Sequence, residues 1–402
     1  MTNTVGRTRR GALLALGVTG ALLLTACGSD AKSAPTTTAA SLATTTASAA
    51  SAASTAASTA ATTAGSSAAT TAPDGTTAAT AATASAPATD NSGPVNLNLV
   101  AFSTPKAADG AIEAAFAATP EGAGTTFTES YGASGDQSRA VVSGLSADVV
   151  HFSLEGDVTR LVKEGLVADD WNKGPNKGIV STSVVVIAVR PGNPKHITGW
   201  DDLVKDGVQI VTPNPGSSGS ARWNILAAYG HVLATGGTED DAKAYLTKFF
   251  DNTVALPGSG RDATTAFLAG TGDVLISYES EAILSRQSGA ALDYVVPDQT
   301  LLIENPGAVL KAANPRAAAF LKFMVGEAGQ TEFVKKGFRS LDNTVTGVKV
   351  DGANDPTNPF PTPAKLLTID KDFGGWSAAA DKFFNADTGI VTLIQQQTGK
   401  TS

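Results

Sequence analysis

The chain has 402 residues, of which 42% are hydrophobic and only 16% are charged, and its formal net charge at pH 7 is −8. This negative balance argues against nucleic acid and against an anionic membrane surface as partners. A single cysteine excludes a disulfide framework and a thiolate metal cluster, and three histidines leave little for a histidine-rich metal site. We therefore expect neither a metal nor a cofactor.

The first residues are typical of an export signal. Three arginines within the first ten residues precede an apolar run that is too short for a membrane span of ~20 residues. The run ends at Leu24-Thr25-Ala26-Cys27, which resembles the lipobox of bacterial lipoproteins, where diacylglycerol alkylates the cysteine. We expect residues 1–26 to be a lipoprotein signal peptide and Cys27 to carry the lipid. The alternative is a simple cleavage site with a chance cysteine.

Residues 27–94 consist mostly of Ala, Thr and Ser. Because this stretch has no aromatic residue and no large apolar residue other than Leu42, it cannot offset the entropy of ordering. We expect a disordered tether that lifts a folded domain off a membrane. An alanine-rich helix is the alternative, and the frequent Thr and Ser disfavour it.

From about Val95 onward, short apolar runs alternate with helical periods. Strands are expected at 95–102, 125–130, 148–153, 183–190, 208–212, 253–256, 273–278 and 292–296. This alternation is typical of α/β architecture with mostly parallel sheets. About 300 residues are too many for one doubly wound core, so we expect two lobes. Such folds bind ligands beyond the carboxyl ends of their strands.

Four turns that follow expected strands share one chemistry. They are Ser103-Thr104-Pro105, Tyr131–Gln137, Thr212–Asn224 and Gly258–Arg261. Thr104 before Pro105 predicts an N-cap, and Ser134 with Gln137 fits a capping box in which Ser134 is the N-cap. Helix starts carry about half a positive charge and free N–H groups, which suits an anion. Arg222 and Arg261 are the only basic residues in these turns, and each could either touch an anion or form a structural ion pair.

The segments Thr212–Asn224, Gly272–Ala282 and Phe373–Trp376 together resemble the sulfate/thiosulfate-binding proteins of bacterial ABC importers. The resemblance implies an α/β structure, the two-lobed periplasmic-binding-protein fold of type II with two hinge crossings, each lobe a mostly parallel sheet flanked by helices. It implies that 95–184 is the first part of lobe I, that 185–290 is lobe II, and that 291–402 is the second part of lobe I with a C-terminal tail.

In that family the bound sulfate accepts hydrogen bonds from main-chain amides at helix starts, from serine hydroxyls and from one tryptophan indole. The resemblance places in this site Ser103, Ser134, Ser218, Gly219, Ser220, Gly260 and Tyr278. Ser103 stands in place of an aspartate, Ser220 in place of a glycine, and Tyr278 in place of the tryptophan. Since an indole only donates whereas a phenol also accepts, Tyr278 is expected to relax discrimination or to admit thiosulfate.

The resemblance implies an extracytoplasmic solute-binding lipoprotein, not an enzyme, that captures sulfate or thiosulfate in an interlobe cleft and delivers it to an ABC permease. The protein would be a monomer on the outer face of the cell membrane, in the periplasmic space, held there by its lipid alone. One alternative is a binder of phosphate or molybdate. A remote alternative is an exported serine hydrolase, although the serine-rich turn 216–220 misses the Gly-x-Ser-x-Gly spacing. Glu279 and Glu281 are expected to be structural or hinge residues rather than paired catalytic acids.

Overall fold

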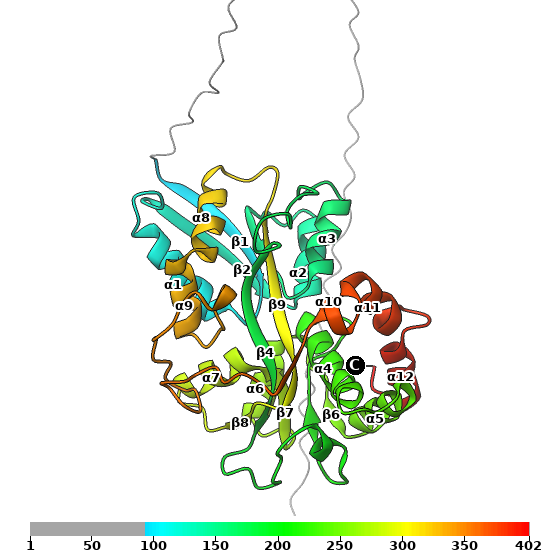
Figure 1. Cartoon of the computed structure of the whole chain (residues 1–402). Coiled ribbons are helices and arrows are strands. Elements are labelled where there is room, and N and C mark those ends of the chain that lie inside the picture. The colour runs from blue at the N-terminus through cyan, green and yellow to red at the C-terminus, as the bar shows by residue number, and fades with distance from the viewer. Residues whose placement is uncertain (1–92, 402) are drawn as a thin grey trace, which may run out of the picture. The chain divides into compact units, whose positions relative to one another are not determined.

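The computed structural model describes residues 93–401 (Figure 1). The predicted signal peptide (1–26), the predicted lipidation site Cys27 and nearly all of the predicted tether (27–94) lie outside the described residues. Within the described part of the chain, no helix is both long enough and apolar enough to cross a membrane.

The described residues alternate between strands and helices. The strands are β1 (Val95–Phe102), β2 (Thr125–Gly132), β3 (Val149–His151), β4 (Ile179–Val189), β5 (Ile210–Val211), β6 (Thr253–Ala255), β7 (Val274–Tyr278), β8 (Asp293–Val295), β9 (Gln299–Val309) and β10 (Lys365–Leu367). The α-helices are α1 (Lys106–Ala117), α2 (Ser134–Val142), α3 (Glu155–Lys163), α4 (Gly219–Ala234), α5 (Glu239–Asp251), α6 (Gly260–Leu268), α7 (Glu279–Gln287), α8 (Arg316–Val325), α9 (Glu327–Lys335), α10 (Ile369–Asp372), α11 (Gly375–Phe384) and α12 (Ile390–Thr398). Two short 3-10 helices are η1 (Trp200–Val204) and η2 (Leu341–Asn343). Each expected strand is present within a few residues of its predicted range. Two further strands, β9 and β10, were not predicted.

The described strands form one mixed sheet in the order β2-β1-β3-β9-β4-β7-β5-β6, with β10 paired to β9 and β8 paired to β4. Parallel pairing holds at both ends of this order, between β1 and its neighbours β2 and β3 and between β5 and its neighbours β6 and β7. The expectation of mostly parallel sheets fails for β4 and β9, which run antiparallel to each other and to the neighbours β3, β7 and β8. The reason is that these two strands carry the chain in opposite directions between the two halves of the sheet.

β4 and β9 are therefore the two predicted crossings. The first part of β4, up to Val184, pairs with β9, and its second part, from Val185, pairs with β7 and β8. β9 continues past β4 and pairs with β3. Each crossing strand has 11 residues, so it takes part in both halves of the sheet.

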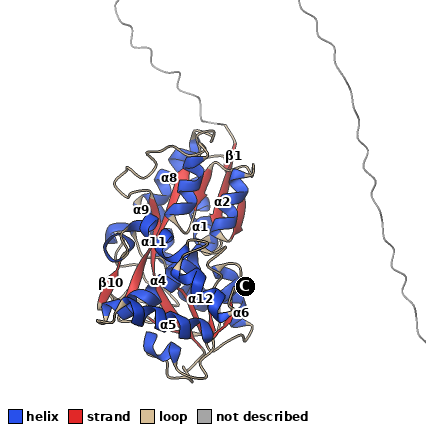
Figure 2. Ribbon diagram, turned by 90° about the vertical axis from the view of Figure 1, so that its right-hand side faces the viewer, coloured by secondary structure: helices blue, strands red, loops and turns tan. Residues whose placement is uncertain are grey.

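Both faces of the first half are buried beneath helices (Figure 2). Leu97, Leu99 and Ala101 of β1 pack into one hydrophobic cluster with α1, α8 and α9, while Val100 packs into another with α2 and α3. Side chains alternate between the faces of a strand, so a strand that is apolar at consecutive positions requires such a double cover.

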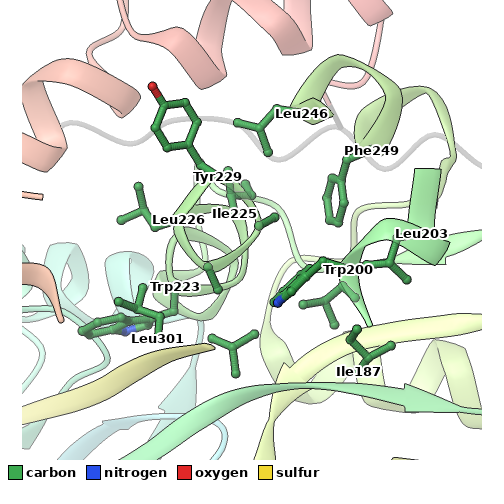
Figure 3. Packing of buried hydrophobic residues seen from close by; sticks show 14 of the residues in the cluster. Ile187, Trp200, Leu203, Trp223, Ile225, Leu226, Tyr229, Leu246, Phe249 and Leu301 are labelled. Atoms are coloured by element: carbon green, nitrogen blue, oxygen red, sulfur yellow. The ribbon is translucent and has the colours of Figure 1, made fainter. Parts of the chain in front are cut away.

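The second half repeats this arrangement. Alternate residues of β4 pack on α4 and α5 on one face and on α6 and α7 on the other. α4 is buried on nearly every side because α5 and the C-terminal helices cover the face turned away from the sheet. In Figure 3, Trp223 lies near Leu301 of β9, whereas Tyr229 points toward the C-terminal helices drawn in faint red.

Candidate functional site

The four turns singled out from the sequence meet around one small, tightly closed cavity. It is lined by Phe102, Ser103, Gly132, Ala133, Ser134, Ser153, Ser218, Gly219, Ser220, Ser259 and Gly260. Six of the residues expected in the site are among them, and Tyr278 is not. Ser103 and Ser134 follow strands of the first half, and the remaining four follow β5 and β6 of the second half.

Main-chain N–H groups at two helix starts face this cavity. Gly219 and Ser220 are the first two residues of α4, and Gly260 is the first residue of α6. Their N–H groups form no hydrogen bond with any other described residue, in keeping with their place in the first turn of a helix. The positive ends of two helix dipoles therefore point at one spot, and this arrangement favours a negatively charged group.

The glycines in the lining leave no room for a side chain. A Cβ atom at Gly219 would lie 2.5 Å from Ser153 Oγ, and one at Gly260 would lie 2.9 Å from Ser220 Oγ. Glycine thus allows the main chain of α4 and α6 to approach the residues opposite.

Two predicted helix caps are wrong. The N-cap of α1 is Pro105 and not Thr104, and the N-cap of α2 is Ala133, so that Ser134 is the first helical residue. The Ser134 hydroxyl is used within the core instead: it donates to Asp157 Oδ2 at 2.6 Å and accepts from the Ser153 N–H at 2.9 Å. The Thr104 hydroxyl is buried without a hydrogen-bond partner among the described residues, 3.2 Å from the point where a Cβ of Gly260 would lie.

Tyr278 ends β7 and lies behind the cavity wall. Its hydroxyl is 2.8 Å from Ser153 Oγ and accepts a longer hydrogen bond, 3.4 Å, from Asn305 Nδ2. Burial raises the pKa of Tyr278 to about 12, so the phenol keeps its proton at neutral pH. Ser153, which does line the cavity, was not predicted from the sequence. The available signal was its position at the carboxyl end of an expected strand, where binding residues gather in α/β folds.

The basic residues of the four turns are engaged away from the cavity. Arg261 forms an ion pair of 2.6 Å with the buried carboxylate of Glu281, and it donates to the Thr104 carbonyl. Arg222 donates to the Pro215 carbonyl, and its guanidinium lies 4.7 Å from the centre of the Phe384 ring. In the part of the chain that the structure describes, no charged residue lines the cavity. The charge of an anion in this cavity would therefore be balanced by main-chain and hydroxyl dipoles and not by a charged side chain.

Glu279 and Glu281 belong to the first turn of α7 and are both buried. Burial raises the pKa of each carboxyl, and the paired arginines, Arg339 for Glu279 and Arg261 for Glu281, oppose this effect. Arg339 follows α9 and Arg261 lies on α6, so the two ion pairs fasten α7 to its neighbours. This geometry favours the structural role that the sequence predicts.

A row of Asp109, His151 and Ser181 has the composition of a hydrolase triad. His151 Nδ1 lies 3.1 Å from Asp109 Oδ1, and Nε2 lies 3.0 Å from Ser181 Oγ. All three side chains are 0% exposed, and none of them lines the cavity. The row joins α1, β3 and β4 inside the core. Among residues 93–401, no group of His, Cys, Asp or Glu side chains is arranged as a metal site.

The comparisons with known proteins agree with this geometry. Residues 97–339 match the profile of the family described as "Bacterial extracellular solute-binding protein". A "Sulfate-binding protein" of Synechococcus elongatus is 40% identical over 315 residues, which cover 75% of this chain and 87% of that protein. A "Thiosulfate-binding protein" of Pseudomonas aeruginosa is 35% identical over 285 residues, which cover 68% of this chain and 83% of that protein.

A solved structure extends the likeness to the fold. The sulfate-binding protein SubI of Mycobacterium tuberculosis is 42% identical, with a TM-score of 0.67, over 72% of this chain and 99% of that one. The resemblance and the fold class predicted from the sequence are thereby confirmed. The chain belongs to the family of bacterial extracellular solute-binding proteins.

Proposed function

We propose that this protein captures sulfate, and also thiosulfate, in the cavity between its helix starts and delivers the anion to an ABC permease for uptake. The observation that carries the proposal is the lining itself. Unbonded N–H groups of Gly219, Ser220 and Gly260 meet serine side chains from both halves of the sheet, and no charged residue lies among the described lining residues. The sulfate- and thiosulfate-binding relatives support the choice of anion.

A lining that supplies mainly donors favours an anion without a proton. Sulfate carries no proton at neutral pH, so every one of its oxygens can accept. A protonated phosphate would turn its own O–H toward another donor, and a buried polar group without a partner costs ~1–3 kcal/mol. Sulfate is therefore the better fit, and phosphate or molybdate is the alternative that the test must separate.

The binding step in this proposal is closure of two lobes. Residues 95–184, together with the part of 291–402 that packs beside them, form one lobe, and 185–290 form the other. Ser103 and Ser134 come from the first, while Ser218 to Ser220 and Gly260 come from the second. Rotation about β4 and β9 would bring the second set of donors onto an anion already held by the first.

Export and anchoring complete the proposal. The signal peptide 1–26 directs the chain out of the cytoplasm, lipid on Cys27 holds it to the outer face of the cell membrane, and the tether 27–94 gives it reach. The protein acts there as a monomer and binds rather than catalyses. The extracellular family description supports this location.

Titration calorimetry at pH 7 with sulfate, thiosulfate, phosphate and molybdate tests the proposal. We expect sulfate to bind at least about tenfold more tightly than phosphate, which corresponds to about 1.4 kcal/mol. Equal or stronger binding of phosphate or molybdate would assign the protein to the alternative. Each anion that binds should also raise the melting temperature as its concentration passes Kd.

A further inference from the structure

Ser153 occupies the point where the two halves of the sheet meet the cavity. It lies two residues beyond the end of β3, its side chain is 0% exposed, and it is part of the cavity lining. Its Oγ and Cβ atoms lie 2.5 and 2.6 Å from the position of a Cβ at Gly219.

Every polar atom of Ser153 is held by a different element. Its N–H donates to Ser134 Oγ of α2 at 2.9 Å. Its carbonyl accepts from Trp223 Nε1 of α4 at 3.0 Å and from Asn305 Nδ2 of β9 at 3.1 Å. Its Oγ lies 2.8 Å from the Tyr278 hydroxyl of β7. Because these bonds fix its main chain, the Ser153 side chain is held between Tyr278 and the cavity.

The hydrogens of the two hydroxyl groups can be counted. Ser153 and Tyr278 bring one each, and only one is used in the hydrogen bond between them. Either hydroxyl can donate across the 2.8 Å contact; in one of the two arrangements Tyr278 accepts from Asn305 Nδ2 and donates to Ser153. The Ser153 hydrogen is then free, and the cavity is the space that Ser153 lines and Tyr278 does not.

We propose that Ser153 is a specificity-determining residue that donates its hydroxyl hydrogen to the bound oxyanion, and that Tyr278 is a positioning residue that acts through it. The inference rests on the proposed function, since it names a further contact of the same site. It gives Tyr278 a different task from the direct contact expected from the sequence. The orientation of Ser153, in the first half, then depends on Tyr278, in the second half. The Ser153 hydroxyl therefore points at the anion only when the two halves are together.

A double-mutant cycle with Ser153→Ala and Tyr278→Phe tests the inference by titration calorimetry with sulfate. A hydrogen bond to a charged group predicts about a ten- to hundredfold loss of affinity for Ser153→Ala. Tyr278→Phe removes one oxygen and keeps the ring, and we expect about a three- to tenfold loss. In the Ser153→Ala background the tyrosine change should cost less than about twofold, because the residue that it positions is gone.

Two buried controls match these changes. Thr253→Val removes a buried hydroxyl that donates to the Phe249 carbonyl, and Tyr229→Phe removes a buried phenol oxygen that has no hydrogen-bond partner among the described residues; neither lines the cavity. Both should bind sulfate like the wild-type protein. A Ser153→Ala variant that folds and binds like wild type would refute the inference. So would a Tyr278→Phe loss of equal size in both backgrounds, since Tyr278 would then contact the anion itself.

The two variants also separate this inference from the proposed function. If Ser153→Ala does not fold, Tyr278→Phe alone decides, and wild-type affinity in that variant counts against the inference. A wild-type protein that binds none of the oxyanions would contradict the proposed function and this inference together. Wild-type binding with unchanged variants contradicts the inference alone.

Discussion

At Gly219 the lack of a side chain sets how closely two halves of the sheet approach each other. Substitution by alanine places a Cβ atom 2.5 Å from Ser153 Oγ and 2.9 Å from Leu154 Cγ. Ser153 is fixed through its main chain, so we expect Gly219→Ala to push the halves apart and to weaken sulfate binding by at least about tenfold, or about 1.4 kcal/mol. Titration calorimetry measures the change.

Gly156 of α3 provides the control, because a Cβ atom there would meet nothing within 4 Å. Gly156→Ala should leave the affinity for sulfate unchanged and raise the free energy of unfolding by up to about 1 kcal/mol through helix propensity. Wild-type affinity in Gly219→Ala would show that the contact with Ser153 is not needed for binding.

The lining of the cavity could be predicted where a turn carried several small residues, and it was missed where the signal was a single side chain. Serine and glycine before α4 and α6 mark helix starts, so their positions at the cavity could be read from the sequence. Ser153 has no such neighbours, and its partners lie 19, 70, 125 and 152 residues away. The caps at Thr104 and Ser134 were each misplaced by one residue; at Ser134 the tertiary hydrogen bonds outweigh the local capping pattern.

Among the elements, β9 shows why a central strand can be missed when strands are predicted from the sequence. Its residues Asn305-Pro306-Gly307 have the composition of a turn. In the structure each of these residues fits a strand. The Asn305 side chain donates to the Ser153 carbonyl and to the Tyr278 hydroxyl. The Pro306 carbonyl accepts from the Phe152 N–H, and this pairing requires no N–H from proline. Gly307 lies where a Cβ atom would meet Val180 at 2.6 Å. Tertiary contacts that the sequence does not display therefore decide this element.

The C-terminal helices are the elements that complete the cover of α4. Phe383 of α11 is 1% exposed, and its ring lies edge-on to Tyr229 of α4 with 4.8 Å between centroids. Phe383→Ala should lower the free energy of unfolding by about 3–5 kcal/mol, because it leaves a cavity between α11 and α4. Urea denaturation followed by circular dichroism measures this loss.

The neighbouring Phe384 is only partly buried and contacts Arg222. Phe384→Ala should cost less than about 2 kcal/mol, since part of its ring remains in water. Equal losses in the two variants would mean that the edge-on contact with α4 is not what stabilises the C-terminal helices.

The stability of the whole molecule should depend on pH through Glu113. This carboxyl is 8% exposed, and its burial together with the nearby carboxylates of Glu129 and Asp109 raises its pKa to about 9. In the unfolded chain the group ionises near its ordinary value of 4.5. Between these two values the folded state holds a proton that the unfolded state has lost, so the free energy of unfolding falls as pH rises, by up to about 1.4 kcal/mol per pH unit.

Glutamine at this position keeps the neutral shape and has no proton to lose. Urea unfolding between pH 5 and pH 8 should therefore show a smaller loss of stability for Glu113→Gln than for the wild-type protein. Glu121→Gln, at an exposed position, should leave the wild-type slope unchanged. Parallel slopes for all three proteins would show that Glu113 ionises alike in the folded and unfolded states.

The late position of α11 and α12 in the chain has a consequence for biogenesis. All the lining residues of the cavity lie before residue 261, whereas the helices that finish the cover of α4 are synthesised later. A nascent polypeptide thus keeps an apolar flank of α4 open to solvent until α11 and α12 have been synthesised. Such a chain is available to chaperones until α11 and α12 are made, and a stop codon before α11 would yield a product that contains every lining residue of the cavity and yet lacks the helices that cover α4.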